Sequence, residues 1–241
     1  MSQPRFLLAS MFVALGIAVA GIATGYGFYA GRTDARYVTV KGLAEREVRA
    51  NLALWSLEVI ANGDDLPAVQ RQIETSTVAV RRFVEAGGLP ADALSLTTLE
   101  VTDRLSNPYQ QQTGGPRFIL RQGVIIRSED VERVASLNGQ VGELARQGVV
   151  LGSRDQSSGV SYLFTRLNDI KPEMLKAATA NARAAAEQFA EDSGSPLGGI
   201  RRANQGVFVI KPRDAVRYAD ETTQIHKIVR VVSTVQYFLE R

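Results

Sequence analysis

One long uncharged stretch near the amino terminus constrains this chain more than any other feature. Phe6 to Ala30 contains no charged residue and no proline over 25 positions. At a helical rise of about 1.5 Å per residue it would be about 37 Å long, which exceeds the roughly 30 Å hydrocarbon core of a bilayer. Tyr26, Phe28 and Tyr29 near its end suit a membrane–water interface. The sequence therefore predicts one transmembrane helix, with residues 1–31 as an anchor in the lipid bilayer.

A cleaved export signal is the alternative interpretation of the same stretch. Arg5 would be its basic region, and Ala18 to Ala20 has the small-x-small form of a processing site. Apolar regions of signal peptides are only about 7 to 15 residues long, and this stretch is longer. We therefore favour the anchor over a signal that would release the rest of the chain.

Small residues in this stretch recur at a spacing that suits contact between membrane helices. Gly21 and Gly25 form one small-xxx-small pair, and Ala14 and Ala18 form another. Such pairs let two helix backbones approach closely inside a bilayer. The alternative is that glycine and alanine are simply common in membrane helices.

The charges that flank the stretch do not agree with export of the domain after it. Only Arg5 precedes the stretch, whereas five basic residues come closely after it: Arg32, Arg36, Lys41, Arg46 and Arg49. This count alone would place that domain inside the cell. Because long folded domains translocate largely regardless of charge, the count does not decide the orientation.

The composition of the chain is that of a folded protein and narrows its possible functions. Hydrophobic residues make up 45% of the sequence and charged residues 22%, with a net charge of +3. The basic residues are interspersed with acids and form no basic patch, so nucleic acid is not an expected partner. There is no cysteine, which excludes disulfides and thiolate chemistry.

After a linker over residues 32–36, alternating strand and helix patterns fill a domain over residues 37–241. Strands are predicted at 37–42, 52–60, 94–105, 118–127, 149–152, 159–165, 207–210 and 228–238. The first two strands are expected to pair with each other. The order of elements predicts an α+β fold, in which about three helices cover mixed β-sheets. A sheet edge left exposed in such a fold needs a partner.

The three helices have recognisable boundaries. Residues 62–65 (NGDD) are expected to form the turn and N-cap of the first, in which apolar residues recur at helical spacing from Leu66 to Val84 until Gly87-Gly88 ends it. Ser128 is expected to cap the second, and Asn168 or Asp169 the third, with Pro172 in its first turn. Alanines crowd the third helix, so we expect it to pack closely on at least two sides.

Several short motifs occur in order along the domain. Residues 38–42 (VTVKG), followed by Glu45 and Val48, are similar to a V-x-G-x-G-E-V strand, although Ala44 replaces its second glycine. The strand ending near Val101 leads to Asn107-Pro108-Tyr109, which looks like a Pro-x-Tyr turn. A further set looks like an alanine helix that ends in G-x-x-L-G: Ala177, Ala178, Ala182, Ala185 and Ala186, then Gly194 and Leu197-Gly198.

Together these motifs resemble the SIMPL-domain proteins of bacterial envelopes, which include the periplasmic immunogenic proteins. The resemblance runs from about Tyr37 to Glu240. It implies an exported α/β domain that assembles into large ring-like oligomers, is linked to oxidative or envelope stress tolerance and has no established catalytic residues. It also implies a single-pass protein of the inner membrane with its large domain in the periplasm, or a soluble periplasmic protein if the stretch is cleaved.

A separate search for catalytic chemistry finds little. His226 is the only histidine, and neighbouring Asp220 and Glu221 lack the i, i+4 spacing that would make a metal site with it. A solvent-facing histidine at the start of the last strand is the simpler interpretation. No G-x-S-x-G, P-loop or G-x-G-x-x-G motif is present, and Trp55 is expected in the core. We therefore predict no catalytic residue, cofactor or metal ligand.

Two functional hypotheses remain. The first is an interaction protein, not an enzyme, that assembles with copies of itself or with another membrane protein through strand edges and the alanine-rich helix. The second is an envelope enzyme or small-ligand binder that uses a cleft beside the polar loop 106–116, with Asp103 as an acid and His226 as a base. Proximity of these two side chains in a closed pocket would distinguish the second hypothesis from the first.

Overall fold

A computed structural model describes residues 3–33, 36–106, 114–152, 159–214, 217 and 220–240, and side chains of the first helix only for residues 11–27. The helices are α1 (Gln3–Thr33), α2 (Leu66–Ala86), α3 (Val131–Gly139), α4 (Gly142–Arg146) and α5 (Leu167–Ser193). Short 3-10 turns are η1 (Ala91–Ala93), η2 (Arg104–Ser106) and η3 (Glu221–Thr223). The strands are β1 (Tyr37–Arg49), β2 (Leu52–Gly63), β3 (Leu94–Asp103), β4 (Phe118–Ser128), β5 (Val150–Gly152), β6 (Gly159–Leu163), β7 (Leu197–Gln205), β8 (Val209–Pro212) and β9 (His226–Leu239).

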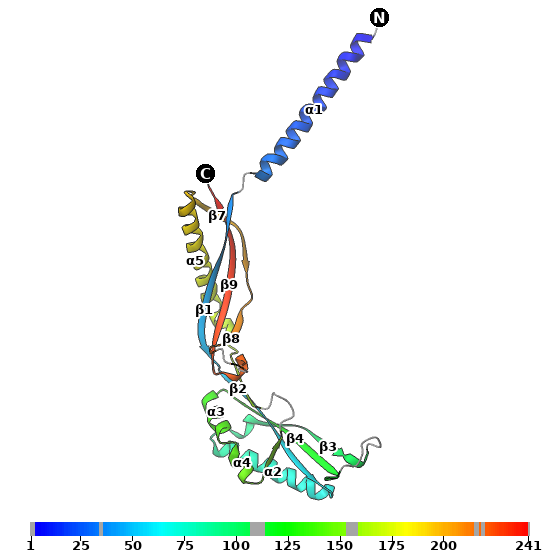
Figure 1. Cartoon of the computed structure of the whole chain (residues 1–241), viewed down its shortest axis with the longest axis vertical. Coiled ribbons are helices and arrows are strands. Elements are labelled where there is room, and N and C mark those ends of the chain that lie inside the picture. Colours follow the sequence, from blue (N-terminus) through cyan, green and yellow to red (C-terminus); the bar gives the residue numbers. More distant parts are fainter. Residues whose placement is uncertain are drawn as a thin grey trace. The chain divides into compact units, whose positions relative to one another are not determined.

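Two antiparallel sheets with helices confirm the predicted α+β class (Figure 1). The chain divides into two compact units: unit 1 holds residues 1–44, 175–207 and 231–241, and unit 2 holds residues 45–174 and 208–230. β1, α5 and β9 contribute residues to both units. Each unit has its own core of buried apolar side chains.

The uncharged amino-terminal stretch forms helix α1, as predicted. The large apolar side chains described in α1 are all exposed, with exposed fractions between 59% for Val19 and 73% for Tyr26. The hydroxyl of Thr24 donates to the carbonyl oxygen of Ala20 at 2.6 Å, so it is satisfied within the helix. Within the part of the chain that the structure describes, no helix is both long and apolar enough to cross a membrane.

Unit 1 is built on a sheet in the order β1-β9-β7, and β8 pairs with β9 in unit 2. Leu239 N donates to Arg36 O at 2.9 Å and Ala50 N donates to Ile225 O at 2.8 Å, so β1 and β9 run antiparallel. Figure 1 shows α5 beside β1 and β9. The unit 1 core joins both layers and consists of Val40, Ala182, Ala186, Val235 and Tyr237.

Close contact between α5 and β1 depends on the small residues of both. Ala178, Ala182 and Ala186 are fully buried. A Cβ added at Gly42 would collide with the carbonyl oxygen of Ala178 and the backbone nitrogen of Ala182. The absence of a side chain at Gly42 therefore sets how closely the helix approaches the strand.

Unit 2 contains the second sheet, in the order β3-β4-β2-β5, with β6 also paired to β2. Helix α2 lies against β2 and β4, and α3 lies against β6 and β2. Trp55 is 1% exposed and meets the ring of Phe83 edge-on, at 6.5 Å between ring centroids, as expected of a core residue. Fully buried Leu120, Val124 and Val134 complete the centre of this core.

Several sequence predictions about these elements were wrong. β1 does not end at Gly42 but continues to Arg49, because the glycine there admits α5 instead of ending the strand. β1 and β2 do not pair but lie in different sheets. β7 was not predicted, because only Ile200 of its nine residues has a strong strand propensity; seven of the nine residues are exposed.

The helix boundaries were only partly predicted. Asp65 caps α2 and accepts from Ala68 N at 3.1 Å, within the turn predicted at residues 62–65. The cap of α3 is Asp130 rather than Ser128, which is the last residue of β4. α5 begins at Leu167, ahead of both predicted caps, and this leaves Pro172 beyond its first turn. Only one stripe of α5 alanines is buried by the described residues, which therefore pack against one side of the helix and not the two that were predicted.

Candidate functional site

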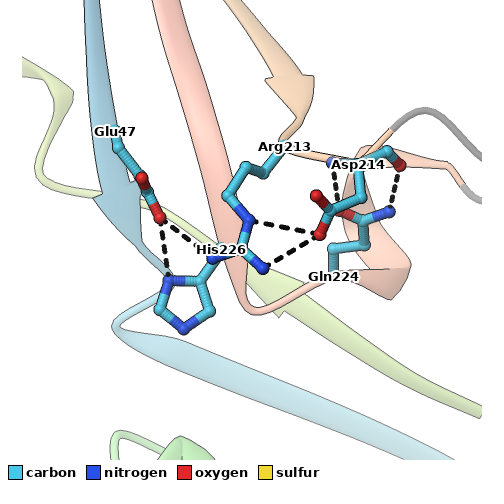
Figure 2. A network of polar contacts seen from close by, with 5 residues as sticks. All are labelled: Glu47, Arg213, Asp214, Gln224 and His226. Atoms are coloured by element: carbon cyan, nitrogen blue, oxygen red, sulfur yellow. Dashed lines mark hydrogen bonds and ion pairs between the residues drawn. The ribbon is translucent and has the colours of Figure 1, made fainter.

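The single histidine belongs to a polar network that joins β1, β8 and β9 within unit 2 (Figure 2). His226 is the first residue of β9, and its side chain is 47% exposed, as the simpler interpretation predicted. Its Nδ1 lies 3.3 Å from Oε1 of Glu47 on β1. Arg213, which follows β8, donates from Nη1 to the same oxygen at 3.1 Å.

The second half of this network holds Arg213 in place. Its Nε and Nη2 donate to Oδ2 of Asp214 at 3.1 and 3.0 Å. The bonds to Asp214, and next to Glu47, raise the pKa of Arg213 above its ordinary value. Asp214 exchanges two hydrogen bonds with the side chain of Gln224, as Figure 2 shows. These side chains satisfy one another in contact with solvent, so the network links the ends of β1, β8 and β9.

A buried lysine lies beside this network. The side chain of Lys227 is 0% exposed, and its Nζ contacts both the carbonyl oxygen and Oε2 of Glu221, the latter at 2.9 Å. A buried charge that lost its partner would destabilise the fold, so this pair ties η3 to β9. Sequence reasoning missed Lys227, although the alternation of Val229 and Val231 along β9 places it on the buried face.

The structure does not bring Asp103 and His226 together. Asp103 at the end of β3 is paired with Arg117, whose Nη2 lies 2.9 Å from Oδ2, whereas His226 contacts Glu47. Of the polar loop 106–116, residues 107–113 lie outside the described residues, and so does the predicted turn at Asn107-Pro108-Tyr109. The acid–base pair of the second hypothesis is therefore absent from the described residues.

The rest of the described chain contains a pocket in unit 2 but no clear metal site. Within it, no group of three or more acidic or histidine side chains could hold a metal ion. A pocket of about 320 Å³ in unit 2 is lined by residues that include Leu52, Pro90, Arg127 and Glu129. It contains side chains of both charge signs and does not indicate a particular reaction.

Strand β3 forms an exposed edge of the unit 2 sheet and pairs with β4 on one side. Leu96 is 46% exposed and Val101 50%, although both stand opposite fully buried residues of β4. Leu105, which follows in η2, is 51% exposed. An irregularity between Leu96 and Leu99 interrupts the ladder. This edge presents apolar surface and strand backbone that the described part of the chain leaves uncovered.

The proposed helix-packing residues have no partner among the described atoms. A Cβ added at Gly21 or Gly25 would meet nothing within 4 Å, and Ala14 and Ala18 are exposed. Their contact with another helix stays a prediction.

Comparison with known proteins gives a family but no activity. The model of the SIMPL family, described as a protein of unknown function (DUF541), matches residues 38–237. No curated protein matches the chain. A crystal structure of an uncharacterized conserved protein from Listeria innocua shares 14% sequence identity, over 78% of this chain and 91% of that one. Its TM-score of 0.19 is too low to support any argument about fold or function.

Proposed function

The chain belongs to the SIMPL family, and from this premise we propose that it is a membrane-anchored interaction protein that assembles with copies of itself in the cell envelope. Helix α1 holds it in the inner membrane, and the SIMPL domain lies in the periplasm. The domain is not an enzyme. It contributes to tolerance of oxidative or envelope stress through the assembly that it forms.

The sequence and surface of α1 support the anchor. The stretch Phe6 to Ala30 is uncharged over its whole length, and its described side chains are exposed on all sides. A helix that is apolar all round is stable in water only when other apolar groups cover it, and lipid would do so. The periplasmic location is supported by the resemblance to envelope proteins and not by the flanking charges.

The observation that carries the assembly is the exposed edge strand β3. Sheet edges in monomeric proteins are commonly short, charged or covered, whereas β3 is ten residues long and carries exposed Leu96 and Val101. Pairing with β3 of a second copy would cover both the strand backbone and this apolar surface. Such an interface is the same on both copies and closes by twofold symmetry.

Light scattering after size exclusion of the full-length protein in detergent tests the assembly. We expect the wild type to form an oligomer that survives dilution, and the double variant Leu96→Lys/Val101→Lys to form smaller species, because two charges would be buried in the contact. Val78→Lys is the control, since Val78 is 46% exposed, like Leu96, but belongs to α2 and not to the edge strand. A wild type that is monomeric at every concentration would refute the proposal. Cross-linking in membranes would reveal another membrane protein if that is the partner.

A further inference from the structure

One end of the unit 1 sheet carries a cluster of exposed aromatic, apolar and basic side chains, which we call the Tyr37 patch. It consists of Arg36, Tyr37, Ile200, Arg201 and Phe238. In Figure 1 the start of β1, the end of β9 and β7 lie side by side at this end. The exposed fractions of Tyr37, Ile200 and Phe238 are 47%, 55% and 37%. Three large apolar side chains are therefore exposed to solvent at one end of the sheet.

Contacts within unit 1 join Arg201 to Tyr37, and the strand ladders place Phe238 beside Tyr37 and Ile200 opposite Tyr237. The guanidinium of Arg201 stacks on the ring of Tyr37, at 4.0 Å from the ring centroid. Arg36 O accepts from Leu239 N at 2.9 Å, so Tyr37 and Phe238 are the next residues of two neighbouring antiparallel strands. The patch is therefore a structured surface of the sheet.

The chain itself limits how far this patch can lie from α1. α1 ends at Thr33 and β1 begins at Tyr37, so four Cα–Cα steps separate them. Even a fully extended chain spans at most about 14 Å over that length. If α1 crosses the bilayer with Thr33 at its surface, Tyr37 must lie within the depth of the lipid headgroup layer or immediately outside it.

We propose that the Tyr37 patch docks on the bilayer surface, where its arginines bind the phosphates of anionic lipid headgroups. This inference rests on the proposed membrane anchor. Aromatic side chains favour the interface between hydrocarbon and water, and arginine extends its charge toward phosphate while its stem stays on apolar surface. Each cation near an anionic surface adds attraction.

The charge of the described residues around the patch fits an anionic partner. Arg36, Arg201 and Arg202 are exposed basic residues at this end. The acids at the same end are Glu240, whose Oε1 lies close to Gly198, and Glu187, Glu191 and Asp192 near the end of α5. α5 packs against the face of the sheet that carries Tyr237, so its acids lie on the side away from Tyr37 and Phe238. Docking would hold the sheet of unit 1 at the membrane by contacts on β1, β7 and β9 in addition to the covalent link to α1.

Single cysteines provide the test, because the chain has none of its own. Full-length variants Ile200→Cys, Leu15→Cys and Val78→Cys are labelled with an environment-sensitive fluorophore and reconstituted into vesicles. The vesicles contain lipid with a nitroxide on the headgroup, which is the quencher for positions 200 and 78, or lipid with a nitroxide on the acyl chain, which is the quencher for position 15. The vesicles are phosphatidylcholine alone or with about 30 mol% phosphatidylglycerol. Leu15 reports on α1 in the bilayer, Ile200 on the patch and Val78 on an exposed site of unit 2 with similar accessibility.

We expect headgroup nitroxides to quench the label at 200 at least about threefold more than the label at 78, and more strongly when the anionic lipid is present. Arg201→Glu should lower quenching at 200, whereas Arg201→Lys, which keeps the charge, should retain most of it. Circular dichroism checks that each variant is folded.

The failures of the two proposals are distinguishable. Quenching at 15 with none above the control level at 200 would overturn the docking and leave the anchor intact. Equal quenching at 200 with and without anionic lipid, unchanged by Arg201→Glu, would overturn the headgroup recognition. Absence of quenching at 15 would refute the anchor, and the docking with it.

Discussion

In unit 2, individual charged side chains hold the ends of neighbouring strands together, and Asp103 is the clearest example. Arg117 donates to its carboxylate from Nε at 3.1 Å and Nη2 at 2.9 Å, and Leu105 N donates at 3.0 Å. The bonds from Arg117, followed by the bond from Leu105, lower the pKa of Asp103 below its ordinary value of 3.8. These bonds hold the end of β3 against the start of β4.

This pKa shift predicts a loss of stability in acid. Because the pKa of Asp103 is lower in the folded state, its contribution to stability is complete above pH 3.8 and is lost as the pH falls toward the folded value. Arg117→Gln should raise the pKa of Asp103 toward 3.8 and flatten the pH dependence of unfolding in that window. Carboxylate NMR titration measures the pKa, and Arg121→Gln on the same strand is the control. An unchanged pKa in Arg117→Gln would show that the pairing is not the cause.

At the scale of elements, the contact between α5 and β1 depends on one glycine. A methyl group at Gly42 would collide with the backbone of α5 at Ala178 and Ala182. Backbone atoms of a 27-residue helix cannot move aside as a flexible side chain could. The helix must therefore shift away from the sheet to accept any larger residue at this position.

We expect Gly42→Ala to lower the free energy of unfolding by about 1–3 kcal/mol or more, because the helix loses close packing along the strand. Urea unfolding of the full-length protein in detergent, followed by circular dichroism, measures the change. Gly199→Ala in β7 is the matched control, since a Cβ there would meet nothing within 4 Å, and it should change stability by less than about 0.5 kcal/mol. Equal effects of the two substitutions would contradict the close approach.

The same elements show how far the sequence could predict the fold. The helix predicted between residues 62–65 and Gly87 matches α2, because one face of that helix is buried and apolar residues therefore recur along it at helical spacing. The predicted end of β1 at Gly42 was wrong. A glycine that ends a strand cannot be distinguished in sequence from a glycine inside a strand that allows a helix to pack closely. The pairing of β1 with β9, about 190 residues apart, depends on tertiary packing that local patterns do not encode.

The candidate functional surfaces were predictable to different degrees. The uncharged stretch Phe6 to Ala30 could be recognised from composition alone. An exposed sheet edge was expected from the fold class, but the sequence did not show that β3 forms it. The Tyr37 patch was not predicted, because Ile200 and Arg201 lie on β7, a strand that the sequence did not reveal. The pairing of Asp103 with Arg117 could not be predicted either, because it depends on the register of β3 on β4.

At the scale of the whole molecule, the two units have separate buried cores. The unit 2 core surrounds Trp55 and Leu120, whereas the unit 1 core surrounds Ala182 and Val235. β1, α5 and β9 are the continuous elements that contribute to both. Regions with their own cores open with their own free energies in native-state hydrogen exchange.

Leu120→Ala should therefore weaken unit 2 selectively. Leu120 is 0% exposed, and removing a buried leucine side chain costs about 2–5 kcal/mol. Native-state hydrogen exchange of the full-length protein should show that loss in the opening free energies of amides in β2 and β4. Amides of β7, such as that of Ala203, should change by less than about 0.5 kcal/mol, because they belong to unit 1. An equal loss of opening free energy in β7 would mean that β1, α5 and β9 couple both cores into one cooperative unit. In that case a contact formed by β3 in unit 2 would also stabilise the Tyr37 patch in unit 1.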